Sequence, residues 1–287
     1  MTNMMRTFKS SGELAGTLVG ALVGAAGAFV VSTAGAIAFA SGAAATTIMP
    51  HRAFYEMQLG IADQNSNVQT VSGRSAFTLG RECDGWRSNE DYVIEFGAQE
   101  GNLDRVLSRF ESWEADTGEM YSFDISESSS FQSAKDFTGF AELKSTGGNA
   151  YFSMADNVAV ELPKNTYFPM RHLNAILDSA KSGKKILAAS VFTGAEPDDA
   201  LLSTNTVIGS WRGDPAADEM GALGQDGYWP VQVAYFKPAA TAAEPEYEIH
   251  FAIQPNGIVR RYVIDYGDFT IIATLLKLES VEMPACS

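Results

Sequence analysis

The segment Leu162–Lys185, LPKNTYFPMRHLNAILDSAKSGKK, interrupts a chain whose other patterns are those of β-strands. Its apolar residues recur at the spacing of an amphipathic helix: Met170, Leu173, Ile176, Leu177 and Ala180. Pro169 suits the first turn, where its missing N–H costs nothing, and Gly183 can take the left-handed conformation just after the helix. The pattern predicts one helix over about 168–182, which must bury its apolar stripe against a sheet or inside a curved one.

Stretches of alternating apolar and polar residues lie on both sides of this segment, separated by Gly, Asp, Asn and Ser. We expect about thirteen to fourteen strands, over residues 49–60, 71–79, 92–96, 105–113, 120–125, 137–144, 150–154, 157–162, 185–193, 204–211, 229–236, 247–253, 258–266 and 269–279. Asn256-Gly257 predicts a type I′ hairpin turn. Short, evenly spaced strands are typical of an antiparallel meander that closes towards a sandwich or barrel. With no internal repeat and no convincing linker, the pattern predicts one mainly β domain over 41–287.

Composition and charge exclude several classes of protein. Hydrophobic residues make up 46% of the chain and aromatic residues 11%, which excludes wholesale disorder. The net charge of −15 argues against nucleic acid or an anionic membrane surface as a partner. The simplest interpretation of this charge is solubility.

Residues 1–40 have the pattern of an export signal. Arg6 and Lys9 precede the uncharged run Leu14–Ala40, and small residues suited to signal peptidase end at Ala40 and again at Ala45. The run is also long enough to cross a bilayer of ~30 Å, and its Gly-x-x-x-Gly spacing suits packing of membrane helices. A retained anchor is therefore the alternative. The weak hydrophobicity of Gly and Ala favours the cleaved signal, after which the protein would not be integral to the membrane.

The chain has two cysteines, Cys83 and Cys286. An even count in an exported chain predicts one disulfide between them. Neither has a C-x-x-C neighbour, which removes the usual redox motif. Two free thiols are the alternative, and the weaker one because exported thiols are usually oxidised.

The histidines give little sign of catalysis. His172 falls in the first helical turn, where the helix dipole disfavours its charged form, and we interpret it as a partly buried structural residue with a general base as the alternative. His250 lies mid-strand opposite the apolar face, and His51 is the third histidine. The chain has no Gly-x-Ser-x-Gly elbow.

Other polar groups do not form a recognisable site either. Two neighbouring loops hold an acidic set: Glu196, Asp198, Asp199, Asp214, Asp218 and Asp226. Their spacing is not that of an EF-hand. The segment Gly221–Gly227 is glycine-rich but is no phosphate-binding loop, and Arg260-Arg261 is an isolated basic pair on opposite faces of a strand. We therefore expect no catalytic residues, no metal and no cofactor, and so no enzyme.

Aromatic residues recur along the strands: Tyr92, Phe96, Trp113, Phe123, Phe251, Tyr262, Tyr266 and Phe269. Such rings can fill the core of a barrel. The alternative is that some of them line a groove for a lipid or a peptide, which larger curved sheets can provide.

Several segments together resemble the EipB-like cell-envelope integrity family: Met49–Leu59, Cys83–Trp86, Leu162–Leu177, Tyr228–Phe236, Asn256–Phe269 and the terminal Cys286. The resemblance implies a periplasmic protein of Gram-negative bacteria that supports the envelope under stress. It implies a β-spiral, an open barrel-like antiparallel sheet with a helix beside or inside it, and a disulfide between Cys83 and Cys286. It brings no catalytic residues, and the family fold is similar to that of periplasmic lipoprotein carriers.

We therefore expect a non-enzymatic periplasmic protein that maintains the envelope by binding a protein, peptide or lipidic partner, whose identity the sequence leaves open. Two alternatives remain: a carrier for lipidated or hydrophobic ligands, and a hydrolase of envelope polymers. Within a spiral, we expect the helix to fill or partly close the apolar interior.

Overall fold

The structure is a computed structural model that describes residues 48–98, 101–131, 133–154, 158–215, 217–238 and 244–286. The predicted export signal, 1–40, and both predicted cleavage sites lie outside the described residues. None of the described helices is both long and apolar enough to cross a membrane.

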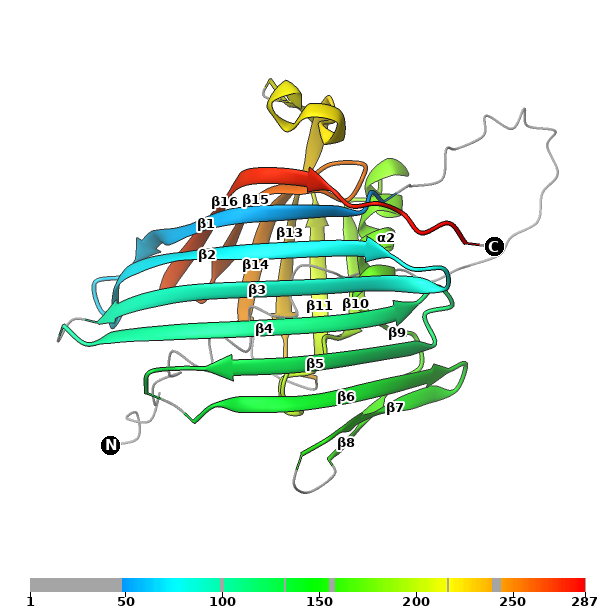
Figure 1. Cartoon of the computed structure of the whole chain (residues 1–287), viewed down its shortest axis with the longest axis horizontal. Coiled ribbons are helices and arrows are strands. Elements are labelled where there is room, and N and C mark those ends of the chain that lie inside the picture. Colours follow the sequence, from blue (N-terminus) through cyan, green and yellow to red (C-terminus); the bar gives the residue numbers. More distant parts are fainter. Residues whose placement is uncertain are drawn as a thin grey trace.

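The described strands form one sheet of sixteen strands (Figure 1). Its first limb consists of β1 His51–Ala62, β2 Val68–Arg81, β3 Gly85–Ala98, β4 Leu103–Ala115, β5 Met120–Ser128, β6 Lys135–Lys144, β7 Gly147–Phe152 and β8 Ala159–Leu162. Its second limb consists of β9 Thr166–Tyr167, β10 Ile186–Phe192, β11 Leu201–Ile208, β12 Arg212–Gly213, β13 Gly227–Phe236, β14 Tyr247–Ile253, β15 Val259–Asp265 and β16 Phe269–Ser280. The helices among the described residues are α2, Pro169–Lys181, and a 3₁₀ helix, η1, Ala217–Leu223.

The sheet is an open, barrel-like curl. Strand order runs from β8 through β1, which pairs with β16, and on to β9, while β12 pairs only with β13. The two edge strands, β8 and β9, are therefore consecutive in the sequence, and the short turn Pro163–Asn165 joins them. In this turn Thr166 N donates to Pro163 O at 3.1 Å, and Asn165 takes a left-handed φ of 67°. This architecture confirms the predicted mainly β, open-barrel fold.

The predicted helix is confirmed at Pro169–Lys181, with Pro169 in its first turn. Gly183 follows with a φ of +77°, as the C-terminal pattern predicts. The strand at β9 precedes the helix and pairs in parallel with β10 after it. A parallel pair needs a crossover connection, and α2 is that connection.

The predicted strand number of about thirteen to fourteen was too low, because β9 and β12 were missed. Each has two residues, too few to show the two-residue period by which strands are found in sequence.

The predicted type I′ turn at Asn256-Gly257 was wrong. Gly257 has a φ of +83°, but Asn256 is not among the described residues with positive φ, which a type I′ turn requires at both positions. Pro255 precedes Asn256, and Gly257 N donates to Gln254 O at 3.0 Å. Proline holds φ near −65°, so the turn begins with an ordinary right-handed geometry and the loop is longer than two residues.

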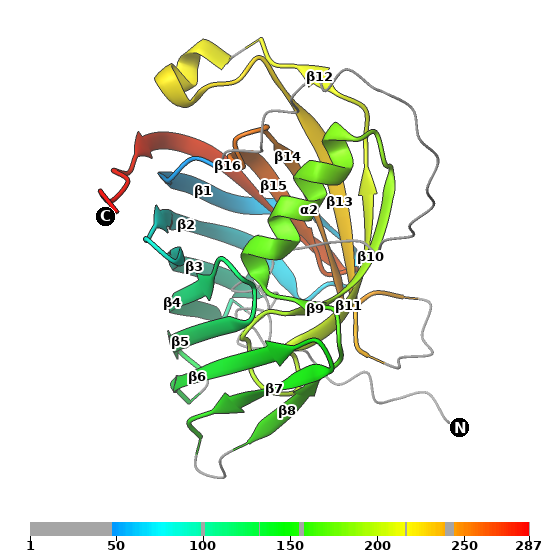
Figure 2. The same ribbon diagram turned by 90° about the vertical axis from the view of Figure 1, so that its right-hand side faces the viewer.

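Side chains from both limbs fill the inside of the curl, and α2 lies between the limbs (Figure 2). Tyr121 on β5 stacks on Phe168, the residue before α2, with ring centroids 5.3 Å apart. Tyr121 also meets Phe192 on β10, at 6.1 Å, and Phe123 meets Phe152 at 5.1 Å. The contact between Tyr121 and Phe192 joins β5 and β10, which are far apart in the sheet order.

A carboxyl group from the first limb holds the start of the helix. Met170 N and Arg171 N donate to the two oxygens of Glu114 on β4, at 2.5 and 2.9 Å. The N-cap residue, Phe168, has no side chain that could accept these bonds, so Glu114 replaces the usual capping side chain.

Candidate functional site

The predicted disulfide between Cys83 and Cys286 is present, with Cα atoms 5.5 Å apart and a sequence separation of 203. Cys83 lies in the turn between β2 and β3, and Cys286 lies in the tail that follows β16. The bond therefore attaches the C-terminal tail to the first limb. The alternative of two free thiols is not the state of this structure.

The predicted structural histidine, His172, is fully buried rather than partly buried. Neither of its ring nitrogens has a hydrogen-bond partner among the described residues, and burial holds its pKa well below the ordinary value. His51 is also buried, with Nδ1 2.7 Å from Met49 O. His250 lies on the outer face of β14, with Nε2 3.3 Å from Glu248 Oε2.

Three of the six acidic residues of the two loops pair with separate cations. Lys135 Nζ lies 2.6 Å from Glu196, Lys237 pairs with Asp199, and Arg260 pairs with the buried Asp214. Within the described residues, no three His, Cys, Asp or Glu side chains gather as they would around a metal ion.

Lys135 on β6 also forms a charged link between the limbs. Besides Glu196, in the loop after β10, its Nζ lies 3.7 Å from Glu127 on β5. Tyr92 donates a hydrogen bond to Glu127 at 3.3 Å. Burial raises the pKa of Glu127, and the ammonium of Lys135 opposes this rise. Lys135 thus pairs with a carboxylate of each limb, Glu127 and Glu196. We interpret this set of ion pairs as a link that holds the two limbs together, and we call it the strut.

The predicted core aromatics are mostly confirmed in that role. Buried in the interior are Tyr92, Phe96, Phe123, Phe251, Tyr262 and Phe269. Tyr266 is half-buried, and Trp113 lies on the outer face of β4, where residues alternate with the buried Ser112 and Glu114. None of these eight residues except Phe251 is among those that line the groove described below.

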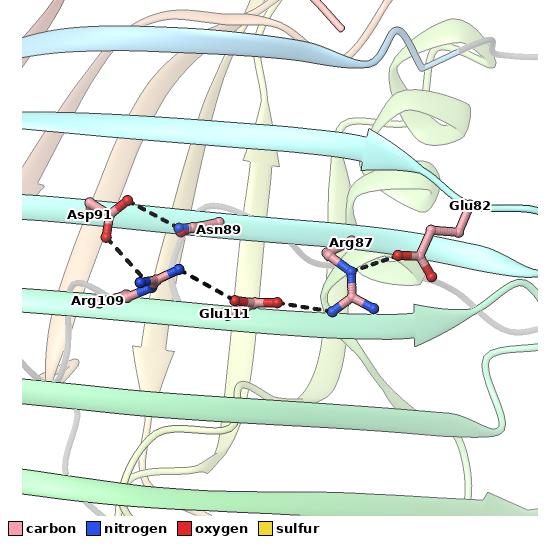
Figure 3. A network of polar contacts seen from close by, with 6 residues as sticks. All are labelled: Glu82, Arg87, Asn89, Asp91, Arg109 and Glu111. Carbon is pink, nitrogen blue, oxygen red and sulfur yellow. Dashed lines mark hydrogen bonds and ion pairs between the residues drawn. The ribbon is translucent and has the colours of Figure 1, made fainter. Parts of the chain in front are cut away.

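The outer face of β3 and β4, together with Glu82 just after β2, carries a ladder of paired charges (Figure 3). Arg87 lies 2.6 Å from Glu82 and 3.0 Å from Glu111, and Arg109 lies 3.7 Å from Glu111 and 3.9 Å from Asp91. Each exposed pair contributes at most about 1 kcal/mol to stability. The ladder leaves neither arginine without a carboxylate neighbour.

A different surface covers the second limb. A groove of about 830 Å³, which we call the outer groove, runs over the outer face of β11 and β13–β16 and is bounded by β12 and η1. Its cations are Arg212, Arg260, Arg261 and Lys277, and Glu219 is the one carboxylate among its lining residues. Aliphatic side chains lie between these charges: Val207, Met220, Pro230, Val263, Leu276 and Leu278.

The prediction that Arg260 and Arg261 lie on opposite faces was wrong, because both line the outer groove. Ala252 pairs with Arg261 and Ile253 with Val259, so Arg260 is an extra residue in β15 and the strand is bulged there. A β-bulge re-aims a side chain that strict alternation would place on the other face. No sequence pattern signals this bulge, since Val259-Arg260-Arg261 has no turn residue.

The 3₁₀ helix η1, which bounds the outer groove, is held by contacts with the β14–β15 loop. Asn256 Nδ2 donates to Leu223 O at 2.9 Å, and Gln254 Nε2 lies 3.3 Å from the sulfur of Met220, so the β14–β15 loop holds η1. Asp214, just before η1, pairs with Arg260 of the bulge. In Figure 1, η1 stands out from the sheet beyond β13 and above β16.

The comparisons with known proteins agree on one family. A family model described as EipB-like matches residues 42–282. The chain is 30% identical over 259 residues to "Cell envelope integrity protein EipB" of Brucella abortus (strain 2308), which covers 89% of this chain and 92% of that protein. It is also similar to the crystal structure of a β-barrel-like protein with a domain of unknown function from Brucella abortus, with a TM-score of 0.75, 27% identity and coverage of 82% of this chain and 99% of that one.

Proposed function

We propose a binding function in the cell envelope for this chain, starting from its membership of a family: the chain belongs to the EipB-like family. In this proposal it is a periplasmic protein that supports envelope integrity and carries out no catalysis. The observation that carries the proposal is its similarity, over most of both chains, to a relative named for cell-envelope integrity.

The disulfide supports the periplasmic part of the proposal. Disulfides form and persist in oxidising compartments, and the two cysteines form one here. The pattern of residues 1–40 supports delivery by a cleaved signal, which remains a prediction.

The arrangement of the interior supports binding on the outside of the sheet. The curl holds α2 and a cluster of aromatic rings contributed by both limbs. A carrier that enclosed its ligand would have to displace these side chains, whereas the outer groove is open to solvent. We therefore place the partner on the outer face rather than inside.

A deletion strain tests the envelope function. Cells lacking the protein should become more sensitive to a detergent such as deoxycholate, and a plasmid copy should restore growth. A fusion of residues 1–45 to alkaline phosphatase, which is active only after export, should give active enzyme. Unchanged detergent sensitivity of the deletion strain would overturn the envelope role, and an inactive fusion would overturn the export.

A further inference from the structure

We propose that the outer groove binds a lipid that carries a phosphate headgroup, with the phosphate held by arginines and the alkyl chain lying on the aliphatic side chains. The inference rests on the proposed function, because it names the partner class and the surface that this binding would use.

Uncompensated positive charge supports the headgroup part. The whole chain has 35 acidic and 20 basic residues, yet the groove is lined by four cations and one carboxylate. Two of the cations are compensated, because Arg260 pairs with Asp214 and Lys277 lies 2.6 Å from Glu279. Arg212 and Arg261 are exposed, and neither has an ion pair with another described residue. The arginines of the β3–β4 ladder, by contrast, are paired with carboxylates. Guanidinium groups suit phosphate because they donate two hydrogen bonds in a planar fork.

Exposed aliphatic side chains support the alkyl part. Val207 and Leu276 are 52% and 56% exposed, and both line the groove beside the cations. Aliphatic groups on a sheet face offer dispersion contacts and removal from water to an alkyl chain. The groove volume of about 830 Å³ lies within the ordinary range for small-ligand sites.

The strands that form the floor of the outer groove favour binding of a lipid over binding of an acidic peptide. β13, β14, β15 and β16 each pair with a strand on both sides, so their backbone groups are already hydrogen-bonded within the sheet. An extended peptide laid across this floor could not pair its own backbone by strand addition. An alkyl chain has no such groups to satisfy.

Calorimetry with dodecyl phosphate below its micelle concentration tests the proposal on the purified protein. We expect it to bind, and to bind at least about tenfold more tightly than inorganic phosphate, dodecyl maltoside or hexaglutamate, since only dodecyl phosphate uses both parts of the groove. The double variant Arg212→Gln/Arg261→Gln should bind it on the order of tenfold or more weakly. The matched control is Arg87→Gln/Arg109→Gln, which changes the net charge equally but on the ladder, and it should bind normally.

Each contrary result overturns the proposal in a defined way. If inorganic phosphate bound as tightly as dodecyl phosphate, the groove would be a site for free anions. If dodecyl maltoside bound as tightly, the groove would be only an apolar surface. If hexaglutamate bound as tightly, the groove would be a site for acidic peptides. Equal loss in the two double variants would mean that only net charge matters. No binding of dodecyl phosphate would overturn the proposal directly.

The deletion strain separates this proposal from the envelope function. If deletion causes detergent sensitivity but the protein does not bind dodecyl phosphate, the groove proposal fails and the envelope function stands. If the protein binds dodecyl phosphate as expected but deletion has no effect on the envelope, the envelope function fails and the groove proposal stands.

Discussion

Glu90 and Glu114 are both buried on the inner face of neighbouring strands, and their surroundings give them different roles. The carboxyl of Glu114 accepts two backbone N–H groups and fixes the start of α2. Glu90 lies near Tyr55 and Tyr262, whose hydroxyls its charge would affect. Burial raises the pKa of Glu90 to about 8, and the neighbouring charge of Asp91 adds to the rise.

The raised pKa of Glu90 predicts that stability falls with rising pH. Below its ordinary pKa of 4.5 the group is protonated in both the folded and the unfolded chain. Between 4.5 and about 8 only the unfolded chain ionises, so stability falls by up to roughly 5 kcal/mol and then levels off. Burial also raises the pKa of Glu114 to about 8, so it contributes to the slope over the same pH range. Glu90→Gln should therefore be more stable than the original protein at pH 8 and should reduce this slope without removing it. Urea unfolding from pH 4 to 9 measures it.

The control for this prediction is Glu95→Gln, on the outer face of the same strand and beside Arg105. It should leave the pH dependence unchanged. If Glu90→Gln and the original protein lose stability equally between pH 5 and 8, Glu90 ionises freely in the folded state.

Glu114→Ala should lower the free energy of unfolding by about 1–3 kcal/mol, because it leaves the buried N–H of Met170 without an acceptor. Glu111→Ala, on the outer face of the same strand, removes only exposed ion pairs and should cost at most about 1 kcal/mol. Chemical denaturation of both variants measures the difference. Equal losses would show that Glu114 has no special part in starting the helix.

At the scale of the element, α2 is the crossover connection that allows two consecutive strands to pair in parallel. Most neighbouring strands in the sheet are antiparallel, but β9 and β10 are parallel and α2 crosses between them. The helix buries Leu173, Ile176 and Leu177 inside the curl. Its apolar stripe is thus part of the core, which supports our expectation that the helix fills the interior.

Leu173→Asp should unfold the protein or open a pocket in it, because an unpaired carboxylate would enter a side-chain site that is 4% exposed. Near-ultraviolet circular dichroism and thermal unfolding report the loss of packing. Asp178→Asn, on the exposed side of the same helix, should behave like the original protein. A folded and fully stable Leu173→Asp variant would mean that the stripe is not part of the core.

At the scale of the whole molecule, three features join the limbs of the open sheet in addition to the pairing of β1 with β16. They are the aromatic contacts around Tyr121, the strut at Lys135 and the disulfide that attaches the C-terminal tail to the turn after β2. The disulfide closes a loop between cysteines that are 203 positions apart in the sequence. A loop of that length could stabilise the fold by up to about 5 kcal/mol in the chain-entropy model.

Cys83→Ser should lower the melting temperature in oxidising buffer and should raise the sensitivity of cells to envelope stress. A reducing agent should remove the difference in melting temperature, because it breaks the same bond in the original protein. A variant that matches the original protein in both stability and stress resistance would leave the disulfide without a role in either.

Local patterns in the sequence determined much of this protein. The helix follows from the spacing of Met170 to Ala180, and most strands follow from alternation, because both periods are set by backbone geometry over a few residues. The pairing of Cys83 with Cys286 needed only the count of cysteines and the prediction of export. Membership of the family follows from ordered segments that extend over most of the chain.

Only the tertiary structure decided which outward side chains meet. β9 and β12 are strands because distant partners pair with them, and Arg260 shares a face with Arg261 because the register slips opposite Ile253. The outer groove combines residues from Val207 to Leu278 that alternation places outside but cannot place together. Strand order and register depend on hydrogen bonds between residues far apart in the chain, and no local period records them.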